Sequence, residues 1–214
     1  RAGTRAEAAR AGAARGRARR ATHAGSWYEA NGQRLRADIR RLLGAEFAEG
    51  ATSDASLKAV IVPHAGLSYS GSVAAAVYAR IDTSVVQRIF LIGPSHHAYV
   101  SGCGLPAEDV TTYRTPMGDL ALDLQTLAAL RRSGGFSTLS MSVDEAEHSL
   151  EMQLPFLAEL LLGSPMRSGP PATLVPMLVG QVRPRDESRY GQLLAPYLEA
   201  EGSLFVISSD FCHW

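Results

Sequence analysis

The sequence predicts an α/β fold with a mainly parallel or mixed central sheet and helices on both faces. Three short apolar runs, at residues 58–63, 88–93 and 204–208, are rich in β-branched residues and indicate strands buried on both faces. An Ala-rich stretch separates the first two runs, and strand, helix, strand within about thirty residues indicates a βαβ unit. With 214 residues, of which 46% are hydrophobic, the chain suits one large α/β domain.

Helices and strands alternate in the first half of the chain. Leu35, Ile39, Leu42 and Leu43 recur at helical spacing, and Gly44 is a typical C-terminal stop. The small side chains between the first two strands permit close packing of a helix on a sheet. The predicted order is a helix over 31–43, a strand over 59–62, a helix over 72–81 and a strand over 89–92.

The second half begins with a looser stretch rich in Gly, Pro and Thr. Acidic residues then precede an amphipathic pattern that ends in two arginines before Gly134 and Gly135. Pro155 is expected to kink or restart a later helix. The predicted order is a loop over 100–118, a helix over 119–132, a helix over 144–162, a surface loop over 163–172, a strand over 173–179, a helix over 184–201 and a strand over 204–208.

Residues 1–21 are almost wholly Ala, Arg and Gly and predict a disordered leader before a domain at 22–214. Seven arginines and one glutamate lie in the first 20 residues, whereas the whole chain has a formal net charge of zero. The domain itself is therefore mildly acidic, which argues against a nucleic-acid partner. An Arg-rich, acid-poor leader also fits organelle targeting.

Other function classes find little support. No apolar run has the length of a membrane span, so no membrane-spanning segment is expected. The two cysteines imply no disulfide framework and favour a reducing, intracellular compartment such as the cytoplasm. The sequence contains no Gly-x-Gly-x-x-Gly, no P-loop and no Gly-x-Ser-x-Gly motif, so nucleotide binding and serine-hydrolase chemistry are not indicated.

Histidines follow each of the three strands. His64 and His96 come just after what we expect to be adjacent strands of one βαβ unit, and Asp210 and His213 follow the last strand. Open α/β sheets bind ligands at the carboxyl ends of their strands, and imidazoles bind borderline divalent metals. The pattern predicts His64 and His96 as metal ligands, with His213, oriented by Asp210, as an acid/base or a further ligand. The alternative is that each histidine only satisfies a loop carbonyl.

Further candidate residues surround these strands. His148 and Glu151 share one face of a predicted helix, and a solvated helix face is the alternative reading. His97 is expected to point away from His96. Trp27 and Tyr69 are either cleft residues or ordinary core aromatics. Both cysteines, Cys103 and Cys212, are expected to be inert and buried.

Five blocks of the sequence, in order from Thr22 to Trp214, closely resemble the Memo family (mediator of ErbB2-driven cell motility). The blocks are His23-Ala24-Gly25-Ser26-Trp27-Tyr28, Pro63-His64-Ala65-Gly66, Gly93-Pro94-Ser95-His96-His97, Glu147-His148-Ser149-Leu150-Glu151-Met152 and Ser208-Ser209-Asp210-Phe211-Cys212-His213-Trp214.

The resemblance implies a class III extradiol dioxygenase-like fold with one iron or copper ion. It implies that His64 and His96 are ligands and that Trp27, Asp210 and His213 line the cleft, with His213 as the acid/base. His23, Tyr69, His97 and His148 are expected to complete a substrate or peptide cleft. The family's third ligand, a cysteine, matches no position up to Trp214, so the domain at 22–214 is expected to be incomplete at its C-terminus.

Two functions from different classes follow from the resemblance. The first is a metal-dependent redox protein that admits oxygen or a small organic substrate. The second is a non-catalytic adaptor in cell-motility signalling whose cleft accepts a phosphotyrosine peptide. The blocks contain no arginine cluster of the kind that phosphate recognition uses, which weakens the second.

Overall fold

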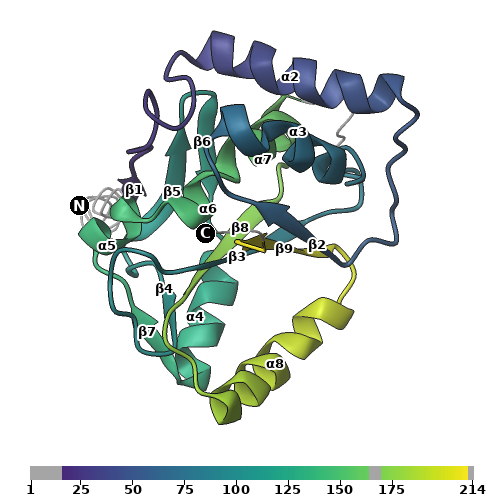
Figure 1. The fold of residues 1–214 in the computed structure, drawn as a ribbon. Helices are drawn as coiled ribbons and strands as arrows, with labels where there is room; N and C mark the ends of the chain where they lie inside the picture. Colours follow the sequence, from purple (N-terminus) through teal and green to yellow (C-terminus); the bar gives the residue numbers. More distant parts are fainter. Residues whose placement is uncertain (1–15, 164–169, 212–214) are drawn as a thin grey trace, which may run out of the picture.

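A six-stranded sheet runs through the centre of the molecule (Figure 1). The computed structural model describes residues 16–163 and 170–211. Neighbouring strands are parallel except β4 and β8, which are antiparallel. The predicted mixed, mainly parallel sheet is confirmed. Its strands, in spatial order, are β2 (Ala59–Pro63), β9 (Ser203–Ser209), β3 (Arg88–Pro94), β8 (Thr173–Val179), β4 (Cys103–Leu105) and β7 (Phe136–Thr138).

Helices cover both faces of this sheet (Figure 1). Above it in that view lie α2 (Gly32–Ala48), α3 (Leu67–Tyr78) and α7 (Leu154–Leu162), and below it lies α8 (Pro184–Glu199). The ring of Tyr78 stacks on Phe156 with centroids 4.8 Å apart, which joins α3 to α7 in the core. On the other face, Phe90 of β3 packs 5.1 Å from Tyr197 of α8. The expected helix over 72–81 begins five residues earlier, directly after the His64 loop.

The expected order of the first two strands in space is wrong. β9 lies between β2 and β3 and pairs with both in parallel register. β2 and β3, which are joined by α3, are therefore not neighbours in the sheet. The last strand of the chain, β9, lies between them. This insertion places Asp210, at the end of β9, between the ends of β2 and β3.

Residues 100–121 form more strand than the loop predicted there. Besides β4, they contain β5 (Val110–Thr115) and β6 (Gly118–Ala121), which pair as an antiparallel hairpin and join β1 (Arg17–Arg19) in a three-stranded sheet. The helix expected over 119–132 consequently begins later, as α4 (Leu124–Ser133). Asp123 caps its N-terminus by accepting a hydrogen bond from the backbone N–H of Thr126.

The predicted leader ends too late. Residues 1–15 lie outside the described residues, but residues 17–19 form β1, and the side chain of Arg19 is completely buried. Its guanidinium donates to Asp144 at 3.2 Å and to Glu151 at 2.7 Å. Composition alone grouped Arg19 with the leader because its partners lie more than a hundred positions further along the chain.

The helix expected over 144–162 is broken into three pieces. They are α5 (Met141–Ala146), α6 (His148–Glu151) and α7, which has Pro155 in its first turn, as the predicted restart requires. Glu147 separates the first two pieces with an extended backbone, and its side chain accepts a hydrogen bond from the N–H of Ser149. This break turns His148 toward the ends of the sheet strands.

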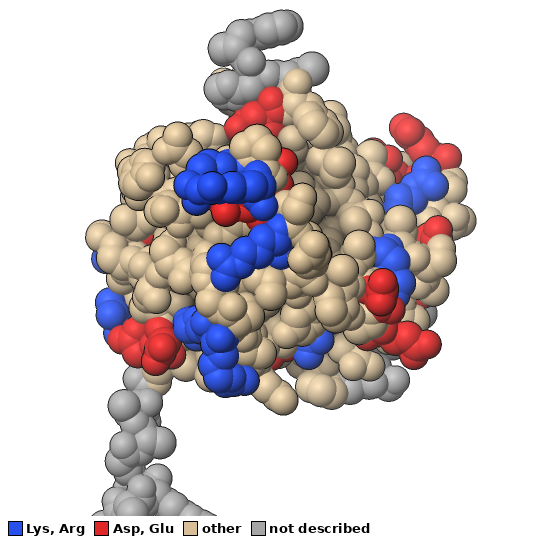
Figure 2. Space-filling model, turned by 90° about the horizontal axis from the view of Figure 1, so that it is seen from below, with Lys and Arg blue, Asp and Glu red and all other residues tan. Residues whose placement is uncertain are grey.

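The surface gives two further observations. Figure 2 shows both basic and acidic side chains on the face seen from below. Arg183, directly before α8, forms an ion pair at 2.7 Å with Asp186 in the first turn of that helix. Among the helices of the described residues, none combines the length and apolar character needed to cross a membrane.

The burial of Arg19 predicts that replacing it destabilises the protein far more than replacing the exposed Arg17. Arg19→Ala leaves Asp144 and Glu151 as uncompensated buried charges, which lowers the free energy of unfolding by about 3–5 kcal/mol. Arg17→Ala removes only an exposed pair with Asp109 and costs about 1 kcal/mol or less. Urea unfolding measures both. Equal losses in the two variants would show that residues 17–19 do not belong to the fold.

Candidate metal centre

The ends of three neighbouring strands bring together His64, His96 and Asp210. His64 follows β2, His96 lies two residues after β3, and Asp210 follows β9 between them. The two imidazole rings lie 5.2 Å apart between centroids. The Asp210 carboxylate bridges them, with one oxygen 2.6 Å from His64 Nε2 and the other 2.9 Å from His96 Nε2.

His148 is the third imidazole of this cluster. Its ring lies 4.4 Å from that of His96 and 5.3 Å from that of His64. One ring nitrogen from each of the three histidines falls within 4.8 Å of the others, a separation at which one metal ion can bind all three. His148 is only 8% exposed, so the solvated helix face considered as the alternative is wrong.

The protonation of His64 is fixed by its neighbours. Its Nδ1 lies 2.6 Å from the Ser208 hydroxyl, which donates its single proton to the carbonyl of Ser149 at 2.7 Å. Ser208 therefore accepts from His64, which places a proton on Nδ1 of that ring. Nε2 is buried and lies 2.6 Å from a carboxylate oxygen of Asp210.

Glu147 orients His96 in a similar way. Its carboxylate accepts from the backbone N–H of His96 at 2.6 Å and from Nδ1 of the same residue at 2.9 Å. Burial opposes ionisation of Glu147, but the hydrogen bonds from His96 and Ser149 outweigh it and hold its pKa below the usual value. A histidine held through Nδ1 by a carboxylate, with Nε2 directed at a site, is the arrangement that metal ligands commonly have.

The pKa values of His96 and His148 are shifted in opposite directions. Burial lowers the pKa of His96, but the hydrogen bonds to Glu147 and Asp210 outweigh this effect and raise it above 6.5. Burial lowers the pKa of His148 to about 4, and the neighbouring histidines add to this effect. His148 is therefore neutral at pH 7, and its Nδ1 is buried with no hydrogen-bond partner among the described residues. These donors fit a borderline divalent metal ion.

Two other predicted cleft residues lie against His148. The indole of Trp27 lies 4.5 Å from the His148 ring and is 37% exposed. The ring of His23 lies 6.1 Å from it, and His23 Nδ1 pairs with Glu151 at 2.9 Å. His97 lies 5.5 Å from His148 but is not part of the three-nitrogen group. Every histidine that the structure describes thus belongs to one connected set of rings.

The remaining candidates lie elsewhere. Tyr69, in the first turn of α3, is 85% exposed and takes no part in the ring contacts of the described histidines. His213 and Cys212 lie outside the described residues. Cys103 is buried as predicted, and burial raises the pKa of its thiol to about 11, which makes it a poor nucleophile or ligand at neutral pH.

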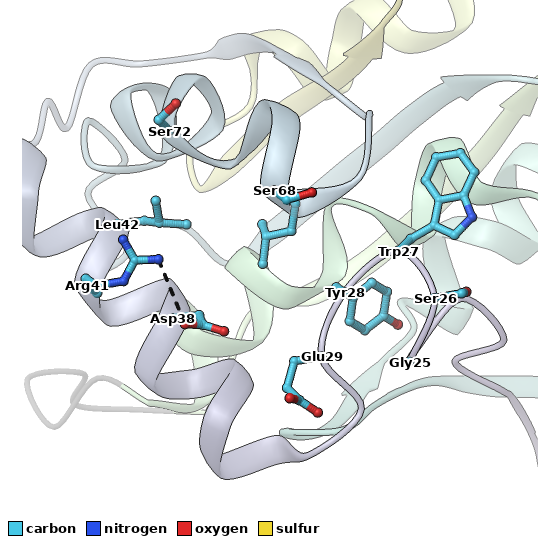
Figure 3. A pocket seen from close by; sticks show the side chains of 11 residues that line it. Gly25, Ser26, Trp27, Tyr28, Glu29, Asp38, Arg41, Leu42, Ser68 and Ser72 are labelled. Carbon is cyan, nitrogen blue, oxygen red and sulfur yellow. Dashed lines mark ion pairs between the residues drawn. The ribbon is translucent and has the colours of Figure 1, made fainter.

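One pocket borders the cluster, and another lies behind the loop that carries Trp27. An apolar pocket of about 380 Å³ lies beside His64 and Asp210 and is also lined by Ile61, Val73 and Phe211. A polar pocket of about 610 Å³ lies behind Trp27, between residues 25–29 and helices α2 and α3 (Figure 3). The Trp27 indole points away from this second pocket, which contains the Asp38–Arg41 pair and no histidine.

Sequence comparisons agree on one family. The family model described as Memo-like protein matches residues 19–214. Protein MEMO1 of Xenopus tropicalis is 43% identical over 196 residues, which are 92% of this chain and 63% of that protein. Protein MEMO1 of Homo sapiens is 41% identical with the same coverage, and the Protein memo-1 homolog of Caenorhabditis elegans is 42% identical over 53% of its own length.

The chain thus spans less than two thirds of the length of these relatives. The matched region includes the strand ends, the break before α6 and the loop that carries Trp27. By family model and by identity, this chain belongs to the Memo family.

Proposed function

We propose that the chain binds one redox-active transition metal ion, iron or copper, through His64, His96 and His148. The observation that carries the proposal is the group of three imidazole nitrogens, one from each ring, that lie within 4.8 Å of one another. Imidazole nitrogens at this separation can bind one borderline divalent metal ion. When bound, the metal supplies one-electron chemistry or Lewis acidity to a small substrate.

The charges around the cluster support a cation. Asp210, Glu147 and Glu151 surround the histidines, and the last two are buried. Burial opposes ionisation of Glu151, but hydrogen bonds from His23 and the charge of Arg19 lower its pKa to about 2. Glu147 and Glu151, whose pKa values are both lowered, are therefore negative at neutral pH, and their field favours a bound positive ion.

Asp210 and His213, which follow β9, are the residues that would accept and donate protons at the site. Asp210 faces the Nε2 atoms of both His64 and His96, so it can accept the proton that His96 gives up when a metal binds. The resemblance assigns an acid/base role to His213, oriented by Asp210. The apolar pocket beside His64 supports a small organic molecule or oxygen as the reacting partner.

A phosphotyrosine peptide is the weaker alternative. Its phosphate would lie beside the three carboxylates, which repel it. The buried Arg19 does not compensate, because its guanidinium is already bonded to Asp144 and Glu151. Protein that binds no metal yet retains a phosphopeptide would favour this adaptor role over the redox role.

Metal titration of single alanine variants tests the ligand set. Wild-type protein is expected to bind one Co²⁺ ion per chain, with Co²⁺ as a spectroscopic probe of an imidazole site. His64→Ala, His96→Ala and His148→Ala each lose at least about 100-fold in affinity, because each removes a nitrogen donor.

His97→Ala is the matched control, since it removes a neighbouring imidazole outside the three-nitrogen group. Its affinity should equal that of the wild type. Unchanged binding by His148→Ala would remove that residue from the ligand set, and unchanged binding by all three variants would contradict the proposed site.

The pH dependence of metal binding follows from His96. Its pKa lies above 6.5, so a proton on Nε2 must leave before a metal binds, and affinity is expected to rise between about pH 6 and pH 8. His148 adds nothing in this range because its pKa is about 4. Calorimetric titrations in buffers of different ionisation enthalpy measure both affinity and proton release. Equal affinity across this range, with no proton released, would contradict the assignment of His96.

A further inference from the structure

Residues 23–28 form a closed turn that carries Trp27. The backbone N–H of Trp27 donates to the carbonyl of His23 at 3.0 Å, and that of Gly25 donates to the carbonyl of Tyr28 at 2.7 Å. Gly25 has a φ of +89°, which a residue with a side chain rarely adopts. The turn therefore has a defined internal shape, and its attachment to the rest of the fold sets where the backbone of Trp27 lies.

One carboxylate attaches both ends of this turn. Glu151 Oε1 accepts from the backbone N–H of His23 at 2.8 Å and from the hydroxyl of Tyr28 at 2.7 Å. Its Oε2 accepts from His23 Nδ1 at 2.9 Å and from Arg19 at 2.7 Å. The side chain of Glu151 is fully buried, so these contacts are protected from water.

Glu151 and His148 are the two ends of α6, a helix of four residues. A turn fixed to Glu151 is thereby fixed relative to His148. On its far side, the carbonyl of Trp27 accepts from the backbone N–H of Leu67 at 3.0 Å, at the start of α3. Figure 3 shows that the side chains of Trp27 and Tyr28 diverge from adjacent positions of the turn.

His148 needs such a support more than the other two histidines do. His64 is held through Nδ1 by Ser208, and His96 is held through Nδ1 by Glu147. No hydrogen bond within the described residues holds either ring nitrogen of His148, although its Nδ1 lies 3.3 Å from a Glu147 oxygen. The orientation of its ring therefore depends on packing, and the indole of Trp27 at 4.5 Å is one of its closest ring contacts.

We propose that Glu151 is a positioning residue: by clamping both ends of the turn 23–28, it holds the Trp27 indole against the His148 imidazole and so keeps the third nitrogen donor directed at the metal site. This inference rests on the proposed metal-binding function. It assigns to ring packing the orienting role that a hydrogen bond has for most metal-bound histidines.

Tyr28→Phe tests the clamp without leaving a buried charge. Glu151→Gln is less suitable because it removes the charge that compensates Arg19, and the variant risks unfolding. Tyr28→Phe removes only the hydroxyl that bonds Glu151. Tyr113→Phe is the matched control, since it removes a buried hydroxyl from Asp144, the other carboxylate bonded to Arg19, which has no recorded bond to the turn.

All measurements use a Trp214→Phe background, in which Trp27 is the single tryptophan. In metal-free protein, the accessibility of Trp27 to acrylamide reports how firmly the turn is held. The dissociation constant for Co²⁺ reports the metal site. Tyr28→Phe is expected to raise acrylamide accessibility and to raise the dissociation constant about tenfold. Tyr113→Phe should leave both values at those of the background protein.

Equal behaviour of Tyr28→Phe and Tyr113→Phe in both measurements would overturn the inference. A gain in Trp27 accessibility without a change in Co²⁺ affinity would overturn the link to His148. A background protein that binds no Co²⁺ would instead refute the proposed function. In that case, unchanged acrylamide accessibility in Tyr28→Phe would refute the clamp independently.

Discussion

The site depends on two buried carboxylates that flank the one-turn helix α6. Glu147, just before it, binds the backbone and ring of His96, and Glu151, at its end, binds Arg19 and the turn that carries Trp27. Burying a carboxylate is costly unless charged and polar hydrogen-bond donors satisfy it. Both are satisfied, and each joins segments that are remote in sequence. The same interactions that permit the burial therefore build the metal site.

A second chain of contacts connects the core to the opposite side of the site. The hydroxyl of Tyr78 donates to the side-chain carbonyl of Gln153, whose amide nitrogen donates to the Ser208 hydroxyl. The Ser208 hydroxyl also accepts from Nδ1 of His64. Ser208 accepts from Gln153 and donates its single proton to the carbonyl of Ser149, so Nδ1 of His64 donates to Ser208 before any ligand arrives. Such preorganisation lowers the reorganisation that metal binding requires. The two histidines at the strand ends are thus oriented from opposite sides, one by a serine and one by a carboxylate.

Local sequence signals predicted the elements that carry the site but not how they meet. The buried strands before His64, His96 and Asp210 were predictable because β-branched runs and their Gly or Pro stops are local features. The insertion of β9 between β2 and β3 was not, because strand order is set by pairing between distant segments. The role of Arg19 was hidden for the same reason: its composition matches that of the leader, and only its distant partners show that it is buried. His148 was placed in the cleft, but helix periodicity gave no sign that the chain breaks at Glu147 and turns this ring toward the strand ends.

The proposed metal site requires His64, His96 and His148 to present metal-accepting nitrogens to a common point. Long-range ¹H–¹⁵N spectra of the imidazoles, recorded without metal and with one equivalent of diamagnetic Zn²⁺, test it most directly. The account predicts that metal-free His64 carries its proton on Nδ1 and that one nitrogen of each of the three rings shifts on loading, while those of His97 do not. A metal-free His64 protonated on Nε2, or three spectra unchanged by Zn²⁺, would contradict it.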